Sequence, residues 1–300
     1  MDFGLSEDQE LLRRTARDFF ETTCPPAVVR EVAASESGIS EEIQRKIAEM
    51  GWTGLLVPES FGGLGLGILD MAILLCEFGR AAAPGPFPFS GTLAVSLITR
   101  AGTRAQKREW LPKLASGERT ASLAWLEESD RIDPAGIRAT ARRSGARYRL
   151  SGRKLFVPYA ATVDLLITAC RTAGKNEASG VTLFLVDRET PGLEAHPLQT
   201  IDGTRRVHEV TMRNVEIARE RMLGRPGGGW PHLERALDLG AVALAADALG
   251  GSERVLELAV DYSKTREQFG RPIGSFQAIK HMAAEMVADV EPARSLLWYA

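Results

Sequence analysis

Apolar residues recur at helical spacing in the first third of the chain. Ser6 and Gln9 have the spacing of a capping box, and Leu5 stands before them as a hydrophobic neighbour. The apolar positions that follow are Leu12, Ala16, Phe19 and Phe20. This spacing predicts an amphipathic helix that begins after Ser6.

Four more helices are expected before residue 120. Ser40 is placed to cap one of them, and Gly51 is placed to end it. The glycine-rich stretch 61–67 suits a tight connection into the next helix. The expected helical spans are residues 43–50, 71–78, 93–98 and 104–114, the last of them capped by Thr103.

The periodicity changes near residue 120 to that of β-strands. Residues 148–158 predict two strands hinged at Ser151 and Gly152, because turn residues interrupt an apolar run. Residues 162–170 and 180–187 are β-branched and aliphatic runs, and residues 208–217 alternate apolar and polar side chains. An all-β segment is therefore expected from about 120 to 222.

Helical spacing returns after the break at residues 226–229. Residues 233–263 are rich in alanine and leucine on all sides, which favours a buried helix. The last predicted helix has its apolar stripe at Ile279, Met282, Met286, Val290 and Leu297. Because that stripe is still exposed to the end of the sequence, we expect that the natural protein continues past Ala300 and that this domain is incomplete here.

These patterns predict an α+β protein of three domains. They are an N-terminal helical domain at 1–119, a middle β domain at 120–224 and a C-terminal helical domain at 225–300.

Composition narrows the class of protein. The chain has 300 residues, of which 44% are hydrophobic and 25% charged, with a net charge of −2. That charge gives no basic surface for nucleic acid, and no apolar run is long enough to predict a membrane span. Three cysteines far apart suggest neither disulfides nor a metal site, and the N-terminus has no secretory signal pattern. We expect a cytoplasmic protein.

The densest cluster of potential binding residues lies between Lys264 and His281. Arg266 offers a planar fork suited to phosphate or pyrophosphate, and Gln268 and Gln277 can hydrogen-bond a ring edge or ribose. Phe269 and Phe276 add flat apolar surfaces. Chemistry alone leaves two interpretations open, a clamp for a large aromatic cofactor or a helical hairpin with a surface arginine.

The segment YSKTREQFGRPIGSFQAIKH, residues 262–281, resembles the C-terminal-domain signature of the acyl-CoA dehydrogenase family of flavoproteins. The stretches LSEDQELLRRTARDFF and MGWTGLLVPESFGGLGLG are similar to the family's N-terminal domain, and LFLVDRETPGLE to its middle domain. The resemblance implies a β-barrel-like middle domain and a C-terminal domain of the four-helix-bundle type. It also implies FAD, an acyl-CoA substrate and electron-transfer flavoprotein or a similar acceptor. A homo- or hetero-oligomer, dimer or tetramer, is expected.

The resemblance assigns cofactor roles to the cluster. In the family, the arginine of R-x-Q-F-G reaches across a subunit interface to the FAD pyrophosphate, and here that position is Arg266. Gln268, Phe269 and Gln277 match the accompanying cofactor contacts.

Two segments depart from the family pattern. Residues 126–133 stand where the family has T-E-P-G-A-G-S-D, so Leu126, Glu127 and Ile132 occupy cofactor positions without its glycines. The family's W-I-T becomes Phe156, Val157 and Pro158, and Pro158 has neither a hydroxyl nor an N–H to offer the flavin.

The resemblance assigns no catalytic base within these residues. The family's usual glutamate would lie beyond Ala300, and its alternative position aligns with Gly240. Asp238 matches an aspartate that contacts the CoA arm and is assigned to substrate binding. Three hypotheses follow: an FAD-dependent dehydrogenase that desaturates acyl-CoA, a non-catalytic partner subunit that completes an FAD site across an interface, and a binding protein without cofactor.

Overall fold

The computed structural model describes residues 4–129, 131–174 and 177–300. Its α-helices are α1 (Glu7–Thr23), α2 (Pro26–Ala34), α3 (Glu41–Glu49), α4 (Ile68–Arg80), α5 (Val95–Ala101), α6 (Arg104–Ala115), α7 (Trp230–Thr265) and α8 (Gln277–Tyr299). Within the described ranges, none of the helices combines the length and apolarity that crossing a lipid bilayer requires.

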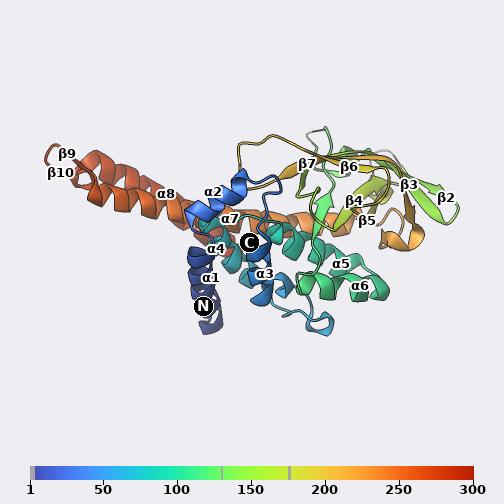
Figure 1. The fold of residues 1–300 in the computed structure, drawn as a ribbon, viewed down its shortest axis with the longest axis horizontal. Helices are drawn as coiled ribbons and strands as arrows, with labels where there is room; N and C mark the ends of the chain where they lie inside the picture. The colour runs from blue at the N-terminus through green and yellow to red at the C-terminus, as the bar shows by residue number, and fades with distance from the viewer. Residues whose placement is uncertain (1–3, 130, 175–176) are drawn as a thin grey trace. The chain divides into compact units, whose positions relative to one another are not determined.

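Strands occupy the middle of the chain and one short hairpin near its end. They are β1 (Ala121–Ala124), β2 (Thr140–Ser144), β3 (Arg147–Pro158), β4 (Leu165–Arg171), β5 (Val181–Asp187), β6 (Leu193–Pro197), β7 (Val207–Ala218), β8 (Met222–Leu223), β9 (Glu267–Gln268) and β10 (Arg271–Pro272). Helices therefore precede and follow the β segment (Figure 1), which confirms the predicted α+β class.

The described residues divide into two compact units. One contains residues 30–67 and 84–240, and therefore the sheet β1–β8 with α3, α5 and α6. The other contains the residues before 30 together with 68–83 and 241–300, and therefore α1, α4, α8 and most of α7. Long-range contacts define these units, so each gathers segments that are far apart in sequence.

The sheet has two halves that meet at one corner. Its strand order is β6-β7-β3-β2-β4-β5-β8, with β1 paired in parallel to β4. Strands β2 and β4 are joined at the single pair Thr140–Arg171. One apolar cluster draws residues from both halves, among them Tyr148 and Leu150 from β3 and Phe184 and Val186 from β5. Two halves closing over one core agree with the predicted barrel-like domain.

Helices cover a second apolar cluster of the same unit. Leu111 and Leu114 of α6 lie in one cluster with Ile167 of β4 and Leu183 of β5. The first turns of α7 join it through Leu233. The start of α7 is thereby anchored on the sheet.

In the other unit, α4 and α7 approach so closely that only glycine fits at the contact. A Cβ added to Gly250 would lie 1.7 Å from the carbonyl oxygen of Cys76, and one added to Gly79 would lie 1.9 Å from that of Asp247. Both neighbours are backbone atoms, so a side chain could be accommodated only by moving the helices apart.

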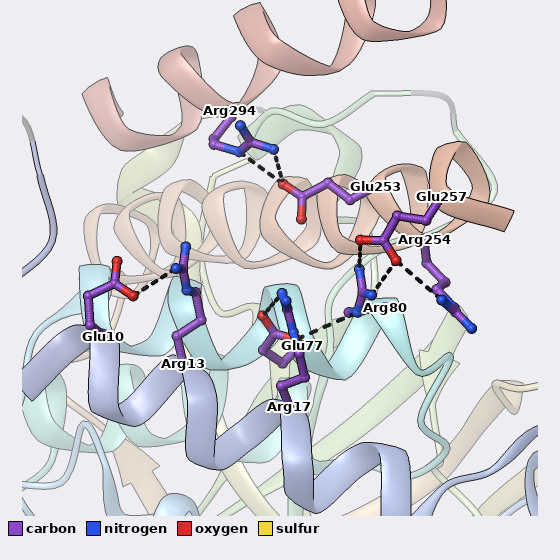
Figure 2. A network of polar contacts seen from close by, with 9 residues as sticks. All are labelled: Glu10, Arg13, Arg17, Glu77, Arg80, Glu253, Arg254, Glu257 and Arg294. Atoms are coloured by element: carbon purple, nitrogen blue, oxygen red, sulfur yellow. Dashed lines mark hydrogen bonds and ion pairs between the residues drawn. The ribbon is translucent and has the colours of Figure 1, made fainter. Parts of the chain in front are cut away.

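An ionic network joins the helices of this unit (Figure 2). At its centre, the buried Glu77 of α4 accepts two hydrogen bonds from Arg17 of α1, at 3.0 and 2.8 Å. Arg80 lies 4.0 Å from Glu77 and also pairs with Glu257 of α7. A carboxylate that is only 3% exposed requires such partners, because an unpaired buried charge is strongly destabilising.

The same network extends to α8. Arg294 donates two hydrogen bonds to Glu253 of α7, at 3.0 and 2.8 Å. Figure 1 shows α7 and α8 as a helical hairpin with β9 and β10 at its tip. The network therefore holds the base of the element that carries residues 264–281.

Two sequence predictions are corrected. Strand β3 is continuous from Arg147 to Pro158, with a bulge between Leu150 and Gly152 in place of the expected hinge. Gly152 is needed there for proximity, since a Cβ would lie 2.5 Å from that of Ala139. The second correction concerns α7, expected to be buried, where Leu244 is 62% and Val255 56% exposed. Neighbouring helices in this chain cover only part of its circumference.

The close helix crossing makes two adjacent glycines respond differently to alanine. Gly250→Ala should lower the free energy of unfolding by about 2 kcal/mol or more, because the new Cβ collides with backbone. Gly251→Ala is the matched control, since its nearest neighbour is the Gly79 oxygen at 3.6 Å. Replacing glycine by alanine inside a helix then stabilises by up to about 1 kcal/mol. Chemical denaturation of both variants measures this, and equal effects would contradict the crossing.

Candidate cofactor site

The tip of the α7–α8 hairpin is built by a two-residue turn. Gln268 of β9 pairs with Arg271 of β10 across Phe269 and Gly270. Both turn residues have positive φ, 54° and 76°, as a type I′ turn requires. Phe269 is 91% exposed at the apex. Local turn chemistry therefore presents an aromatic ring to the surroundings.

Arg266 has a fixed backbone and an available side chain. Its N–H donates to the Tyr262 carbonyl at 2.9 Å, and its carbonyl accepts from Ile273 N at 2.8 Å. The side chain is exposed, and among the described residues it has neither an ion-pair partner nor a hydrogen-bond partner. A guanidinium on a rigid backbone without an internal carboxylate suits an external anion such as pyrophosphate.

Two aromatic rings and a second arginine flank Arg266. Phe269 and Phe276 meet edge to face, with ring centroids 6.0 Å apart. The Arg271 guanidinium lies over the Phe276 ring, 4.3 Å from its centroid. Gln268 and Gln277 are exposed on the same segment. The tip thus brings together all four cofactor residues predicted there.

A second group of predicted residues comes together in the β unit. The loop after β1 lies beside the end of β3, where Leu155 N donates to the Leu126 carbonyl at 2.9 Å. Lys154 bonds the Trp125 carbonyl at 3.2 Å and the Glu127 carboxylate at 2.6 Å. Leu126 and Glu127 therefore lie beside Lys154 and Leu155, the two residues that precede Phe156.

The residues of β3 face different ways. A register shift against β7 falls between Lys154 and Val157. Phe156 there has φ 52° and is 55% exposed, whereas the Val157 side chain lies in an apolar cluster with Val210. Pro158 pairs with Val207. The Phe156 ring is available to a ligand, and Val157 could contact one only through its backbone.

The loop that follows β1 supplies an apolar side chain and a hydroxyl. Ile132 is 74% exposed. The Ser129 hydroxyl is buried and has no hydrogen-bond partner among the described residues. Asp130, which belongs to the segment 126–133, lies outside the described residues. An orphaned buried hydroxyl suggests a missing polar partner, such as a ligand atom.

Asp238 lies on α7 and is exposed, 3.7 Å from Arg235. Gly240 lies two residues later. A Cβ added there would lie 2.7 Å from the end of the Leu93 side chain, which is flexible. A larger residue at 240 could be accommodated by moving Leu93.

Sequence reasoning missed Lys154 and His208. Lys154 is wholly buried in a strand whose inward positions are otherwise apolar, and that misplaced charge was the available signal. His208 is 5% exposed on β7 opposite Val157, and its Nδ1 has no partner among the described residues. Four scattered histidines gave no pattern that would single it out.

These residues fit FAD, the cofactor that the family resemblance implies. The hairpin offers an exposed guanidinium and amides for the pyrophosphate and ribose portions, and Phe156 offers a flat face for a ring system. Ser129 supplies an unpaired buried hydroxyl. In the part of the chain that the structure describes, no three His, Cys, Asp or Glu side chains gather as metal ligands.

Three sequence models of one family match consecutive parts of the chain. They describe the acyl-CoA dehydrogenase N-terminal domain at residues 6–118, the middle domain at 122–215 and the C-terminal domain at 227–300. An acyl-CoA dehydrogenase of Bacillus subtilis (strain 168) is 31% identical over 300 residues, which cover 99% of this chain and 79% of that protein.

Solved structures of acyl-CoA dehydrogenases have the same fold as this chain. Butyryl-CoA dehydrogenase from Megasphaera elsdenii has a TM-score of 0.91 at 29% identity, over 100% of this chain and 80% of that one. The ChsE4–ChsE5 complex from Mycobacterium tuberculosis contains a chain with a TM-score of 0.90 at 29% identity, over 100% of this chain and 78% of that one.

Burial of His208 predicts a pH-dependent stability. Burial lowers the pKa of the imidazole, a hydrogen bond with the Val157 backbone opposes this, and the Arg206 charge lowers it further. The unfolded chain therefore binds a proton first as the pH falls below about 6.5, and the free energy of unfolding decreases there by at most about 1.4 kcal/mol per pH unit.

The check is chemical denaturation between about pH 7.5 and about pH 5.5. His208→Gln should flatten this dependence relative to the unaltered protein, with exposed His196→Gln as the control. Parallel curves for all three proteins would show that His208 does not contribute.

Proposed function

Because the chain belongs to the acyl-CoA dehydrogenase family, we propose that it binds FAD and takes part in the α,β-desaturation of an acyl-CoA thioester. Members of the family are FAD-dependent oxidoreductases that act on CH–CH bonds. The observation that carries the proposal is the hairpin tip, where Arg266 has no ionic partner among the described residues. We also propose the domain division 1–119, 120–224 and 225–300.

The hairpin tip would hold the phosphate end of FAD. Arg266 would pair with the pyrophosphate through two parallel hydrogen bonds, and Gln268 and Gln277 would bond ribose or ring-edge atoms. Phe269 would supply an apolar contact. We assign this tip to the FAD of a second subunit in an oligomer, as the family resemblance implies, and the 91% exposure of Phe269 leaves the tip open to such a contact.

The loop after β1 and the end of β3 would hold the ring end. Phe156 would cover one face of the flavin, with Leu126 and Ile132 beside it and the Val157 backbone at its edge. Glu127 would act from behind this surface, since its carboxylate already bonds Lys154. Pro158 can donate no hydrogen bond. The buried Ser129 hydroxyl, which has no partner among the described residues, would instead bond a flavin atom.

Desaturation requires removal of an α-proton while a hydride leaves the β-carbon. FAD supplies the hydride acceptor, N5, when it is bound. A carboxylate beside an apolar acyl chain is the suitable base, because desolvation raises its pKa. We assign the exposed Asp238 to binding the CoA arm and leave the base unassigned. Electron-transfer flavoprotein or a similar acceptor would reoxidise the flavin.

A second candidate function is that of a non-catalytic subunit that completes a partner's FAD site. It is favoured by glycine at position 240, by Pro158 and by similarity to a chain from a complex of two named proteins. In this case Arg266 would serve FAD bound mainly by an unlike chain, and the partner would contribute the base.

Arg266 tests the cofactor clamp. Arg266→Ala should weaken FAD binding at least about tenfold, since a charge-assisted contact contributes about 1.5–3 kcal/mol. Lys264→Ala, which removes an exposed cation paired with Asp261 at 3.2 Å, should leave the affinity within about twofold. Titration followed by flavin absorbance gives both values. Equal losses would mean that general positive charge, and not the Arg266 fork, attracts FAD.

Position 240 separates the two candidate functions. If the chain has its own base, a saturated acyl-CoA should bleach the flavin of the unaltered protein under anaerobic conditions. If the chain has no base, bleaching should occur only in the Gly240→Glu variant. The new carboxylate can be accommodated there because the Leu93 side chain can move aside. Gly240→Gln is the matched control, of the same shape without the charge. Bleaching by both variants would exclude the carboxylate as the cause.

A further inference from the structure

Lys154 is a charged residue in an otherwise apolar interior. Its side chain is 0% exposed. Its Nζ lies 2.6 Å from Glu127 Oε1 and 3.2 Å from the Trp125 carbonyl oxygen. Desolvating an ammonium group is costly, and only close partners make it tolerable. Lys154, near the end of β3, therefore binds two residues of the loop after β1, Trp125 and Glu127.

The Glu127 carboxylate extends this link to a third segment. Oε2 accepts the N–H of Arg138 at 3.0 Å, and Oε1 accepts the N–H of Ala139 at 3.0 Å. The side chain is 10% exposed. One carboxylate thus satisfies a buried cation and two backbone donors that belong to the chain leading into β2.

Lys154 lies two residues before the candidate flavin contact, Phe156. Phe156 follows Lys154 by two positions, at the register shift, and has the left-handed φ of 52° that few non-glycine residues adopt. Leu155 between them donates to the Leu126 carbonyl. An uncommon backbone conformation persists only where its surroundings hold it.

We propose that Lys154 and Glu127 are positioning residues, and that their buried ion pair sets the shape of the surface formed by residues 125–127 and 154–156. Its consequence for FAD, through the Phe156 ring, rests on the proposed function. The competing explanation is that the pair only adds stability. The two differ because a positioning pair alters the local surface even in protein that is fully folded.

The test uses Lys154→Met, which keeps the length of the side chain without its charge, and Glu127→Gln, which keeps its shape. Each is measured well below its unfolding temperature. Amide hydrogen exchange at Arg138, Ala139 and Leu155 should accelerate at least about tenfold, while exchange in α6 stays unchanged. FAD affinity should fall about tenfold, and the shape of the bound flavin absorbance band should change.

The chain offers a matched control on the same strand. Arg149 of β3 pairs with Glu216 at 3.0 Å, with both side chains about half exposed. Arg149→Met should leave local exchange, FAD affinity and the flavin band unchanged. The double variant Lys154→Met with Glu127→Gln should regain thermal stability relative to Lys154→Met without regaining FAD affinity.

The outcomes separate the possibilities. Unchanged local exchange and an unchanged flavin band in folded Lys154→Met would overturn positioning and leave a stabilising role alone. If the unaltered protein binds no FAD, the proposed function fails, and the exchange rates still decide whether the pair sets the surface. If Lys154→Met does not fold, the same readouts on Glu127→Gln decide the question.

Discussion

The candidate ring site depends on one buried ion pair, Lys154 with Glu127. A lone ammonium in this interior would be strongly destabilising, so the loop after β1 has to bring a carboxylate to it. That carboxylate then satisfies two backbone N–H groups at the entry to β2. Three segments separated in sequence are joined, and Phe156, two residues after Lys154, is exposed beside them.

The other unit holds the long helical hairpin formed by α7 and α8. Its helices meet where glycines let α4 and α7 touch backbone to backbone, and arginine–glutamate pairs join α1, α4, α7 and α8. Close packing supplies rigidity, and the paired charges supply specificity of register at a modest net energy. The result is a firmly held base for a tip whose candidate binding residues are exposed.

The positions of these residues agree with the proposed function. Arg266, Gln268 and Phe269 lie on a tight turn with little internal packing, which suits contact with another molecule. Phe156 lies near the end of β3, next to residues that contact the loop after β1, which suits the reacting end of a cofactor. The family membership is consistent with both candidate sets occurring in one chain. Under the proposed function, the departures at Gly240 and Pro158 would concern chemistry more than binding.

Much of this could be read from the sequence. The capping box at Ser6, the helix cap at Thr103, the apolar stripes and the change from helical to strand periodicity are local signals, and the structure confirms them. The motif around Arg266 is also local, because a two-residue turn and its flanking side chains need only neighbouring residues. The α+β class and the turn that presents the candidate cofactor residues therefore followed from the sequence.

Tertiary structure decided what depends on distant residues. The partner of Lys154 is 27 positions away. Glu77 pairs with Arg17 of α1 and Arg80 pairs with Glu257 of α7, so no periodicity along α4 reveals these contacts. The predicted hinge at Gly152 was wrong for the same reason. Glycine is required at 152 because a side chain there would collide with Ala139, which is distant in sequence. A sequence records which side chains are polar or small, but burial and contact distance, which give those properties their energetic meaning, exist only in the folded chain.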